Sequence, residues 1–381
     1  MKDIALYIHF PWCVRKCPYC DFNSHEAGRD EAAYLQALLK DLEYEAQMWQ
    51  GVQIKSIFIG GGTPSLASGQ FYQTLLAAVK DSFPVTHDLE VTMEANPGAL
   101  EYDRFEAYLA AGINRLSMGV QSFQDEKLHA LGRVHSSQQA AKAFEEARKA
   151  GFKRINLDLM FGLPGQSLED GLYDLQTAID FNPDHLSWYQ LTIEPNTAFY
   201  AQPPKLDLEV SHDLWEQGRA LIHSAGFKQY EVSAYAKPNQ ECRHNVHYWQ
   251  FGDYAAIGAG AHGKQTRDDG VWRYHKTRLP AHYLKRLDRV ATSATPNGHP
   301  FTGQAHVLTR EDREFEYFLN HLRLIKPVQK HDYESKTAGD WSVLLEKMKP
   351  LESLGYLTLN ENSFQLTDDG FAFLDEVLTR L

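Results

Sequence analysis

The chain of 381 residues contains only four cysteines, has no apolar run near 18 residues, and carries fewer basic than acidic residues. Few cysteines exclude a disulfide-stapled scaffold and suit a reducing compartment. Without a long apolar run or an apolar leader, the sequence predicts neither a membrane-spanning helix nor secretion. A net charge of −12 argues against a general nucleic-acid-binding or membrane-surface protein. We therefore expect a cytoplasmic protein that binds no nucleic acid and has no stable membrane insertion.

Three of the four cysteines lie within eight residues and form the pattern C-x3-C-x2-C at Cys13, Cys17 and Cys20. Three thiolates are one ligand short of a closed zinc site, and one short of the four that usually hold an iron–sulfur cluster. We interpret the triplet as the holder of a cubane cluster with one open iron. A zinc site completed by Cys242 or a histidine, and three unrelated buried thiols, are the alternatives. Arg15 and Lys16 lie between the thiols, where positive charge favours the thiolate.

Apolar and β-branched segments alternate with helical patterns six times between residues 4 and 225. A typical helix is expected to begin after Ser136 and to end at Gly151, and another is expected over residues 100–110. Such alternation predicts a parallel sheet with right-handed crossovers, and six repeats are too few for a closed eight-fold barrel. We therefore predict an α/β fold, a partial (β/α)6 barrel with one open side. The predicted strands cover residues 4–10, 54–59, 89–94, 113–120, 154–160 and 185–192.

Residues suited to ligand binding follow the ends of these strands. A triple glycine at residues 60–62 follows the second strand, where backbone amides can approach a ligand closely. Glu94 ends the third strand, the position at which barrel folds place binding groups. The alternatives are a tight turn that binds nothing and an ordinary loop carboxylate.

The segment Tyr7-Ile8-His9-Phe10-Pro11-Trp12-Cys13, with Tyr19 before the last cysteine, resembles the radical S-adenosylmethionine (SAM) superfamily, and within it the oxygen-independent coproporphyrinogen III oxidase group. The resemblance implies a [4Fe–4S] cluster on the three cysteines and the same partial-barrel fold. It also implies that SAM chelates the fourth iron through its amino and carboxylate groups. The positions that match SAM-binding residues are Tyr7, Tyr19, Gly61, Gly62, Thr63, Glu94, Gln121, Arg133 and Asp158.

Individual roles follow from the same resemblance. Tyr19 is expected near the adenine and Glu94 at the ribose hydroxyls. Asp158, which precedes a Gly-Leu-Pro-Gly turn, is expected near the sugar. Arg133 suits the SAM carboxylate through paired hydrogen bonds, with a plain surface charge as its alternative.

A second group of histidines and aromatics occupies residues 242–249, Cys-Arg-His-Asn-Val-His-Tyr-Trp. Imidazole is a common ligand of haem iron, and flat aromatics suit a porphyrin face. Composition alone favours a partly buried polar turn with core aromatics. The pattern His-Asn-x-x-Tyr-Trp, however, resembles the motif of the HemW subgroup of haem chaperones. That resemblance implies haem bound through His244, with His247 and then Cys242 as lower-ranked candidates.

The oxidase group normally has a fourth cysteine two residues after the third, where this chain has Phe22. This departure argues against coproporphyrinogen decarboxylation. The leading hypothesis is a haem chaperone with a SAM-coordinated cluster that delivers haem to haem-requiring proteins, respiratory and membrane-associated ones among them. The alternatives are a radical SAM oxidase of coproporphyrinogen-like substrates and a zinc-stabilised interaction protein. The sequence identifies no catalytic residue and does not tell whether SAM is cleaved.

Three segments are expected. Residues 1–235 form the barrel, residues 236–309 hold the haem motif and a connection that is exposed and charged over 264–300, and residues 310–381 form a winged-helix-like α+β domain. In this last segment we predict helices over 311–323, 341–354 and 370–381 and a hairpin over 355–367. Winged-helix modules often bind DNA, but the lack of basic charge favours a protein contact or a lid over the substrate.

Overall fold

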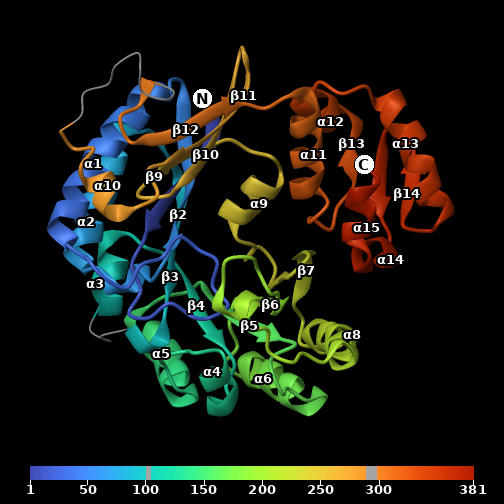
Figure 1. Ribbon diagram of the computed structural model, residues 1–381, viewed down its shortest axis with the longest axis horizontal. Coiled ribbons are helices and arrows are strands. Elements are labelled where there is room, and N and C mark those ends of the chain that lie inside the picture. Colours follow the sequence, from blue (N-terminus) through green and yellow to red (C-terminus); the bar gives the residue numbers. More distant parts are fainter. Residues whose placement is uncertain (100–103, 289–297) are drawn as a thin grey trace.

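The computed structural model describes residues 1–99, 104–288 and 298–381. Its body is one large sheet whose centre consists of parallel strands in sequence order (Figure 1). These strands confirm the predicted repeats of the partial barrel. Their bounds are β1 (Lys2–Phe10), β2 (Val52–Gly61), β3 (Val85–Ala95), β4 (Arg115–Gln121), β5 (Ile155–Phe161) and β6 (His185–Gln190).

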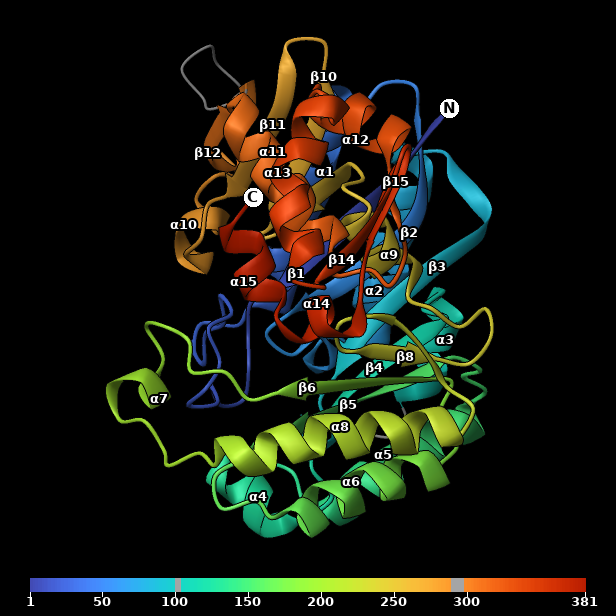
Figure 2. The same cartoon turned by 90° about the vertical axis from the view of Figure 1, so that its right-hand side faces the viewer.

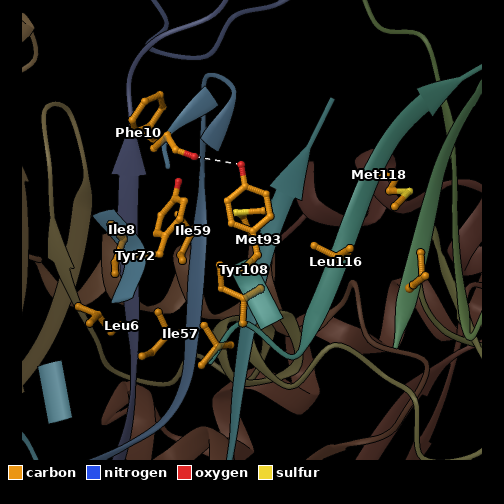
Figure 3. Close-up of a cluster of buried hydrophobic side chains, with 14 of the residues drawn as sticks. Leu6, Ile8, Phe10, Ile57, Ile59, Tyr72, Met93, Tyr108, Leu116 and Met118 are labelled. Atoms are coloured by element: carbon orange, nitrogen blue, oxygen red, sulfur yellow. Dashed lines mark hydrogen bonds between the residues drawn. The ribbon is translucent and has the colours of Figure 1, made fainter. Parts of the chain in front are cut away.

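Successive side chains of a strand point to opposite faces, and in these strands the side chains that point outward are apolar. Ile8, Ile57, Met93 and Leu116 on this face are buried against helices, and Figure 3 shows this cluster. Neighbouring helices pack side by side around the outside, and Figure 2 shows the later ones along β5 and β6. They are α1 (Glu31–Met48), α2 (Gly69–Ser82), α3 (Arg104–Ala111), α5 (Ser137–Ala150), α6 (Leu168–Asp180) and α8 (Leu208–Ser224).

The helix ends follow the predicted signals. Ser136 caps α5 through a reciprocal pair of hydrogen bonds with Gln139, and Gly151 ends it in the left-handed conformation. The helix predicted over residues 100–110 is present as α3, but residues 100–103 of that prediction lie outside the described residues. Shorter helical segments connect the other elements: η1 (Pro64–Leu66), η2 (Pro97–Ala99), α4 (Asp125–Ala130) and α7 (Ala198–Ala201).

The inner face of the same strands is polar. Glu90 and Glu94 lie on this face of β3, Ser117 and Gln121 on this face of β4, and Asp158 on this face of β5. The apolar residues between them face the helices. The sheet therefore separates an apolar layer outside from a polar hollow inside, and the hollow holds the candidate site.

The sheet continues beyond both edges of the parallel centre. At one edge β9 (Tyr254–Ile257) lies parallel to β1, followed by the antiparallel strands β10 (His262–Arg267), β11 (Gly270–Lys276) and β12 (Thr302–Val307). At the other edge lie β8 (Ala234–Ala236) and β7 (Lys228–Glu231). The helix α9 (Arg243–Trp249), which carries the predicted haem motif, lies between the sheet and the C-terminal domain (Figure 1).

The expectation of an exposed, charged connection over residues 264–300 holds only in part: some of its charged side chains are exposed, but the described part of that range is not an irregular connection. β10, β11 and α10 (Pro280–Leu284) lie there instead, while residues 289–297 are outside the described residues. Two lysines of this segment, however, are buried and paired. Lys264 contacts Asp253 at 2.9 Å, and the Lys276 ammonium lies 2.7 Å from Asp41 and 2.5 Å from Glu45.

The C-terminal domain has a core of its own around a small antiparallel sheet with the order β13-β15-β14. The predicted hairpin is confirmed, whereas the helix predicted over 370–381 is interrupted at Phe373, and α12 was not predicted. Among the described residues no helix is both long and apolar enough to cross a membrane. The elements are α11 (Arg310–His321), β13 (Val328–Gln329), α12 (Lys330–Thr337), α13 (Trp341–Ser353), β14 (Leu357–Asn360), β15 (Ser363–Leu366), α14 (Asp368–Ala372) and α15 (Leu374–Thr379).

Candidate functional site

The three clustered cysteines lie on a loop that leaves the end of β1 and is closed on itself by backbone hydrogen bonds. The amide of His25 donates to the Pro11 carbonyl at 2.8 Å, and the amide of Cys13 donates to the His25 carbonyl at 3.0 Å. Trp12, almost fully buried, anchors the start of the loop. The three thiols are free and half-buried, and they line a single cavity of about 460 Å³. The predicted convergence of the three thiols is therefore present in the fold.

Burial raises the pKa of the Cys13 and Cys20 thiols, and negative charge on the neighbouring cysteines raises both further. Lys16 lowers the pKa of Cys20, as expected, but burial outweighs it. Arg15 has a different role, because its guanidinium donates to the Gly132 and Arg133 carbonyls. Thiols this close together resist losing their protons unless a cation takes up the charge. This donor set therefore fits a metal cluster.

The alternative of a zinc site completed by Cys242 finds no support in the fold. Cys242 is buried and does not line the cavity, and its sulfur lies 3.7 Å from Glu90 Oε1. The described residues contain one group of carboxylates and histidine close enough to hold a metal, Asp41, Glu45 and His299. The Lys276 ammonium contacts all three of these side chains.

The triple glycine turn lies against the start of the cysteine loop. A Cβ on Gly61, whose φ is +114°, would lie 2.5 Å from the His9 ring, and one on Gly62 would lie 2.5 Å from the Trp12 carbonyl oxygen. The amides of this turn are engaged within the protein: Gly61 donates to Glu94 at 3.1 Å, and Gly62 donates to the Phe10 carbonyl at 2.7 Å. The glycines therefore allow the turn to pack closely beside the cysteines.

Two carboxylates face each other across the hollow. Burial, with the neighbouring charge of Asp158, raises the pKa of Glu94 to about 7. Burial also raises the pKa of Asp158, although Ser117 donates to it at 3.0 Å and Asn156 at 2.8 Å. Such acceptors suit hydroxyl groups or a cationic ligand. SAM carries both, in its ribose and in its sulfonium and ammonium groups.

Arg133 extends over the cysteine loop. Its Nη1 lies 3.6 Å from Cys17 Sγ and 3.5 Å from the Tyr19 hydroxyl, and its Nη2 donates to the Gly119 carbonyl at 2.6 Å. Its Nε is buried without a hydrogen-bond partner among the described residues. A guanidinium held beside the cluster ligands is well placed for an anionic group, so the alternative of a plain surface charge is wrong in this fold.

Gln121 ends β4 with a φ of +72°, a left-handed conformation that is uncommon for a residue with a side chain. Its Oε1 accepts a hydrogen bond from the Tyr189 hydroxyl at 2.7 Å. Strained backbone of this kind concentrates at functional sites.

The cavity is lined by all predicted SAM-contacting residues except Tyr7. The Tyr7 hydroxyl is bonded to His9 Nδ1 at 3.0 Å, and its ring packs near Phe58 and His244.

The predicted haem ligands are buried on or beside α9. His244 is 7% exposed and does not line the cavity. Its Nδ1 lies 3.4 Å from the Ser56 hydroxyl, and its ring lies 5.2 Å from that of Phe58. Burial lowers the pKa of His244 to about 3, so the ring is neutral. Two other residues of the same helix, Asn245 and Trp249, do line the cavity.

The lower-ranked candidates have structural partners. His247 Nε2 contacts the Asp253 carbonyl at 2.6 Å, and a Cβ on Gly252 would lie 2.4 Å from the His247 ring. Burial raises the pKa of Cys242 to about 11. These contacts explain both residues as parts of the packing of α9.

The cavity also contains residues that sequence reasoning did not select. Ser187 and Tyr189 lie on the inner face of β6, and the two-residue alternation of that strand was the signal that could have identified them. Glu231 and Arg323 line the cavity from β7 and from the loop after α11. Nothing in the sequence indicates that these distant segments meet.

Residues 7–176 match the family described as the radical SAM superfamily, and residues 308–373 match the HemN C-terminal domain. The chain is 48% identical to the heme chaperone HemW of Escherichia coli (strain K12), over 99% of this chain and 98% of that protein. It is 46% identical to HemW of Haemophilus influenzae, over 99% and 97% of the two chains.

A solved structure of coproporphyrinogen III oxidase (HemN) from Escherichia coli, a radical SAM enzyme, has the same fold. Its TM-score is 0.82 at 22% identity, with 100% of this chain and 90% of that chain covered. The cysteine triplet, the inner face of the barrel and the full-length similarity agree. The chain belongs to the HemW family of the radical SAM superfamily.

Proposed function

We propose that the chain is a haem chaperone, which binds haem and delivers it to haem-requiring proteins, respiratory and membrane-associated ones among them. The observation that carries this proposal is the shared cavity: the cluster cysteines line it together with Asn245 and Trp249 of the His-Asn-x-x-Tyr-Trp helix. The relatives named heme chaperone HemW, which match along almost their whole length, support the same function. The free thiols of all four cysteines support a cytoplasmic location.

The cofactor site fits a [4Fe–4S] cluster with SAM, which when bound supplies one-electron chemistry at the sulfonium. In this proposal Cys13, Cys17 and Cys20 hold the cluster. Arg133, beside Cys17, pairs with the SAM carboxylate, and Glu94 accepts from the ribose hydroxyls. The closed cysteine loop keeps the three thiols beside the cavity.

Haem would be held by His244. Its imidazole is already neutral and needs to lose no proton to bind iron. Its Nε2 has no hydrogen bond to the described residues, whereas His247 Nε2 is committed to the Asp253 carbonyl. Because the ring is covered by Tyr7 and Phe58, haem binding requires α9 or these rings to move. The proposed carrier therefore opens when it takes up its cargo.

The test is a haem titration of anaerobically reconstituted protein, followed by the Soret band. We expect stoichiometric binding in the natural chain and in His87→Ala, a fully exposed histidine used as the control. His244→Ala should lose the Soret shift. An unchanged titration for His244→Ala would remove this residue as the ligand and leave the function standing.

A natural chain that binds no haem would contradict the chaperone function itself. Turnover of coproporphyrinogen III under reducing conditions would favour the oxidase instead. The oxidase is the less supported alternative, because the full-length relatives are named HemW and the position of the fourth cysteine is Phe22.

A further inference from the structure

The C-terminal domain contributes one cation to the cavity of the barrel. Arg323 follows α11 and lines the cavity together with the cluster cysteines. The backbone fixes its position. The Val232 amide donates to the Arg323 carbonyl at 2.9 Å, and the Ile325 amide donates to the Tyr230 carbonyl at 3.0 Å. The C-terminal domain is thus paired to β7 at the point where Arg323 enters the cavity wall.

The guanidinium of Arg323 lies over an aromatic ring. Its Cζ lies 4.5 Å from the centroid of Trp249, the last residue of the His-Asn-x-x-Tyr-Trp motif. Its Nη2 lies 3.3 Å from Glu231 Oε2, and Glu231 is itself fixed by the amide and hydroxyl of Ser233. A cation–π contact and an ion pair together hold the guanidinium in position.

This held guanidinium has unused donor capacity. Arg323 Nε and Trp249 Nε1 are both buried without a hydrogen-bond partner among the described residues. Nη1 has no hydrogen bond to the described residues, while 31% of the side chain is exposed. A buried donor without a partner is costly, so a site that keeps two of them beside a cavity is suited to a ligand that supplies acceptors.

The other cations of the cavity have different positions. Arg15 donates to backbone carbonyls of the loop after α4, and Arg133 lies beside Cys17 at the thiol side. Arg323 lies at the α9 side, next to an aromatic platform. An arginine fork binds a carboxylate with two parallel hydrogen bonds.

We propose that Arg323, stacked on Trp249, binds a carboxylate of the flat ligand that the cavity receives. This inference rests on the proposed function, under which the carboxylate is a propionate of haem. It makes the C-terminal domain part of the binding site. The ligand is then recognised at two points: its metal by a residue of α9, and its anionic edge by a residue of the other domain.

The experiment compares haem with haem dimethyl ester, in which both carboxylates are neutral, on reconstituted full-length protein in the same detergent. A charge-assisted hydrogen bond is expected to favour haem over the ester by about 10- to 100-fold in the natural chain. Arg323→Gln should bind both ligands with nearly the affinity that the natural chain has for the ester. The matched control is Arg267→Gln, since Arg267 also stacks on a tryptophan, Trp272 at 4.8 Å, and does not line the cavity.

Arg323→Gln with the full preference for haem over its ester would overturn the proposal, and so would a natural chain that binds the two equally. A variant that loses both ligands while its circular dichroism spectrum is unchanged would show a role in shaping the pocket, and this too contradicts carboxylate binding. A natural chain that binds neither ligand would instead refute the haem-binding function on which the inference rests.

Discussion

The buried ammonium of Lys276 joins β11 to α1, and its removal should cost the chain much of its stability. Lys276 is fully buried between Asp41 at 2.7 Å and Glu45 at 2.5 Å, both on α1. His299 Nε2 lies 3.0 Å from the same ammonium. Removing one partner of a buried ion pair costs about 3–5 kcal/mol, because the remaining charge has neither solvent nor partner. Two carboxylates are left here, so we expect about 5 kcal/mol for Lys276→Met at pH 8.

The cost should depend on pH in a defined direction. In the natural chain the pKa of His299 is lowered to about 2. Burial is the larger cause, and the positive charge of Lys276 is the second. Without it, His299 lies 3.3 Å from Asp41 and 3.4 Å from Glu45 and can hold a proton between them. The folded variant then binds a proton that the unfolded chain releases above pH 6.5, so its stability falls as the pH rises. At about 1.4 kcal/mol per pH unit, the deficit should shrink to about 3 kcal/mol at pH 6.5.

Urea unfolding of the natural and variant chains at pH 6.5 and pH 8 measures both effects. The control is Lys40→Met on the same helix, where an exposed pair with Glu43 at 2.6 Å should contribute less than about 1 kcal/mol. If Lys276→Met unfolds within 1 kcal/mol of the natural chain at pH 8, or if its deficit is equal at both pH values, the reasoning from burial is refuted.

Two further predictions concern the cofactor site. Because the pKa of Glu94 is about 7, SAM affinity measured by equilibrium dialysis should increase from pH 6 to pH 8 as the carboxylate forms. Glu94→Gln should bind SAM about tenfold more weakly, with an affinity that does not change with pH. A variant that keeps the pH dependence of the natural chain would contradict the role of Glu94. Gly61→Ala places a Cβ 2.5 Å from the His9 ring at a φ of +114° and should lower the unfolding free energy by about 2–4 kcal/mol. The control is Gly226→Ala, where φ is +86° and no atom lies within 4 Å, so only the strain of a left-handed backbone should lower its unfolding free energy. Equal losses of unfolding free energy in the two variants would show that contact with His9 is unimportant.

The sequence was enough to predict the barrel and, through the family resemblance, eleven of the residues that line the cavity. Strand alternation is a local signal, and it placed Glu94 near the end of β3, whereas Asp158, in the middle of β5, was selected through the family resemblance. The cysteine triplet is also local, so its convergence follows from spacing alone. Residues such as Lys276 were misjudged for a physical reason. A charged residue is expected at the surface unless it has a partner, and here the partners lie more than 200 residues earlier in the chain.

Arg323 could not be found for a related reason. Its place in the cavity depends on pairing between the loop after α11 and β7, two segments without a shared motif. His244 shows the opposite case: its motif is visible in the sequence, but only the fold shows that its ring is covered by Tyr7 and Phe58. Local pattern therefore predicts which residues carry chemistry, and long-range packing decides which of them are accessible.

The position of β1 has a consequence for biosynthesis. β1 is synthesised before both of its neighbours, β2 and β9, and β9 ends at Ile257. About 200 residues must follow β2 before the second edge of β1 can be paired, which takes about 10–40 s at roughly 5–20 residues per second. During that interval the strand that leads into the cysteine loop has one open edge, and open edges promote aggregation. We therefore expect the nascent chain to need protection at this open edge until β9 has been made.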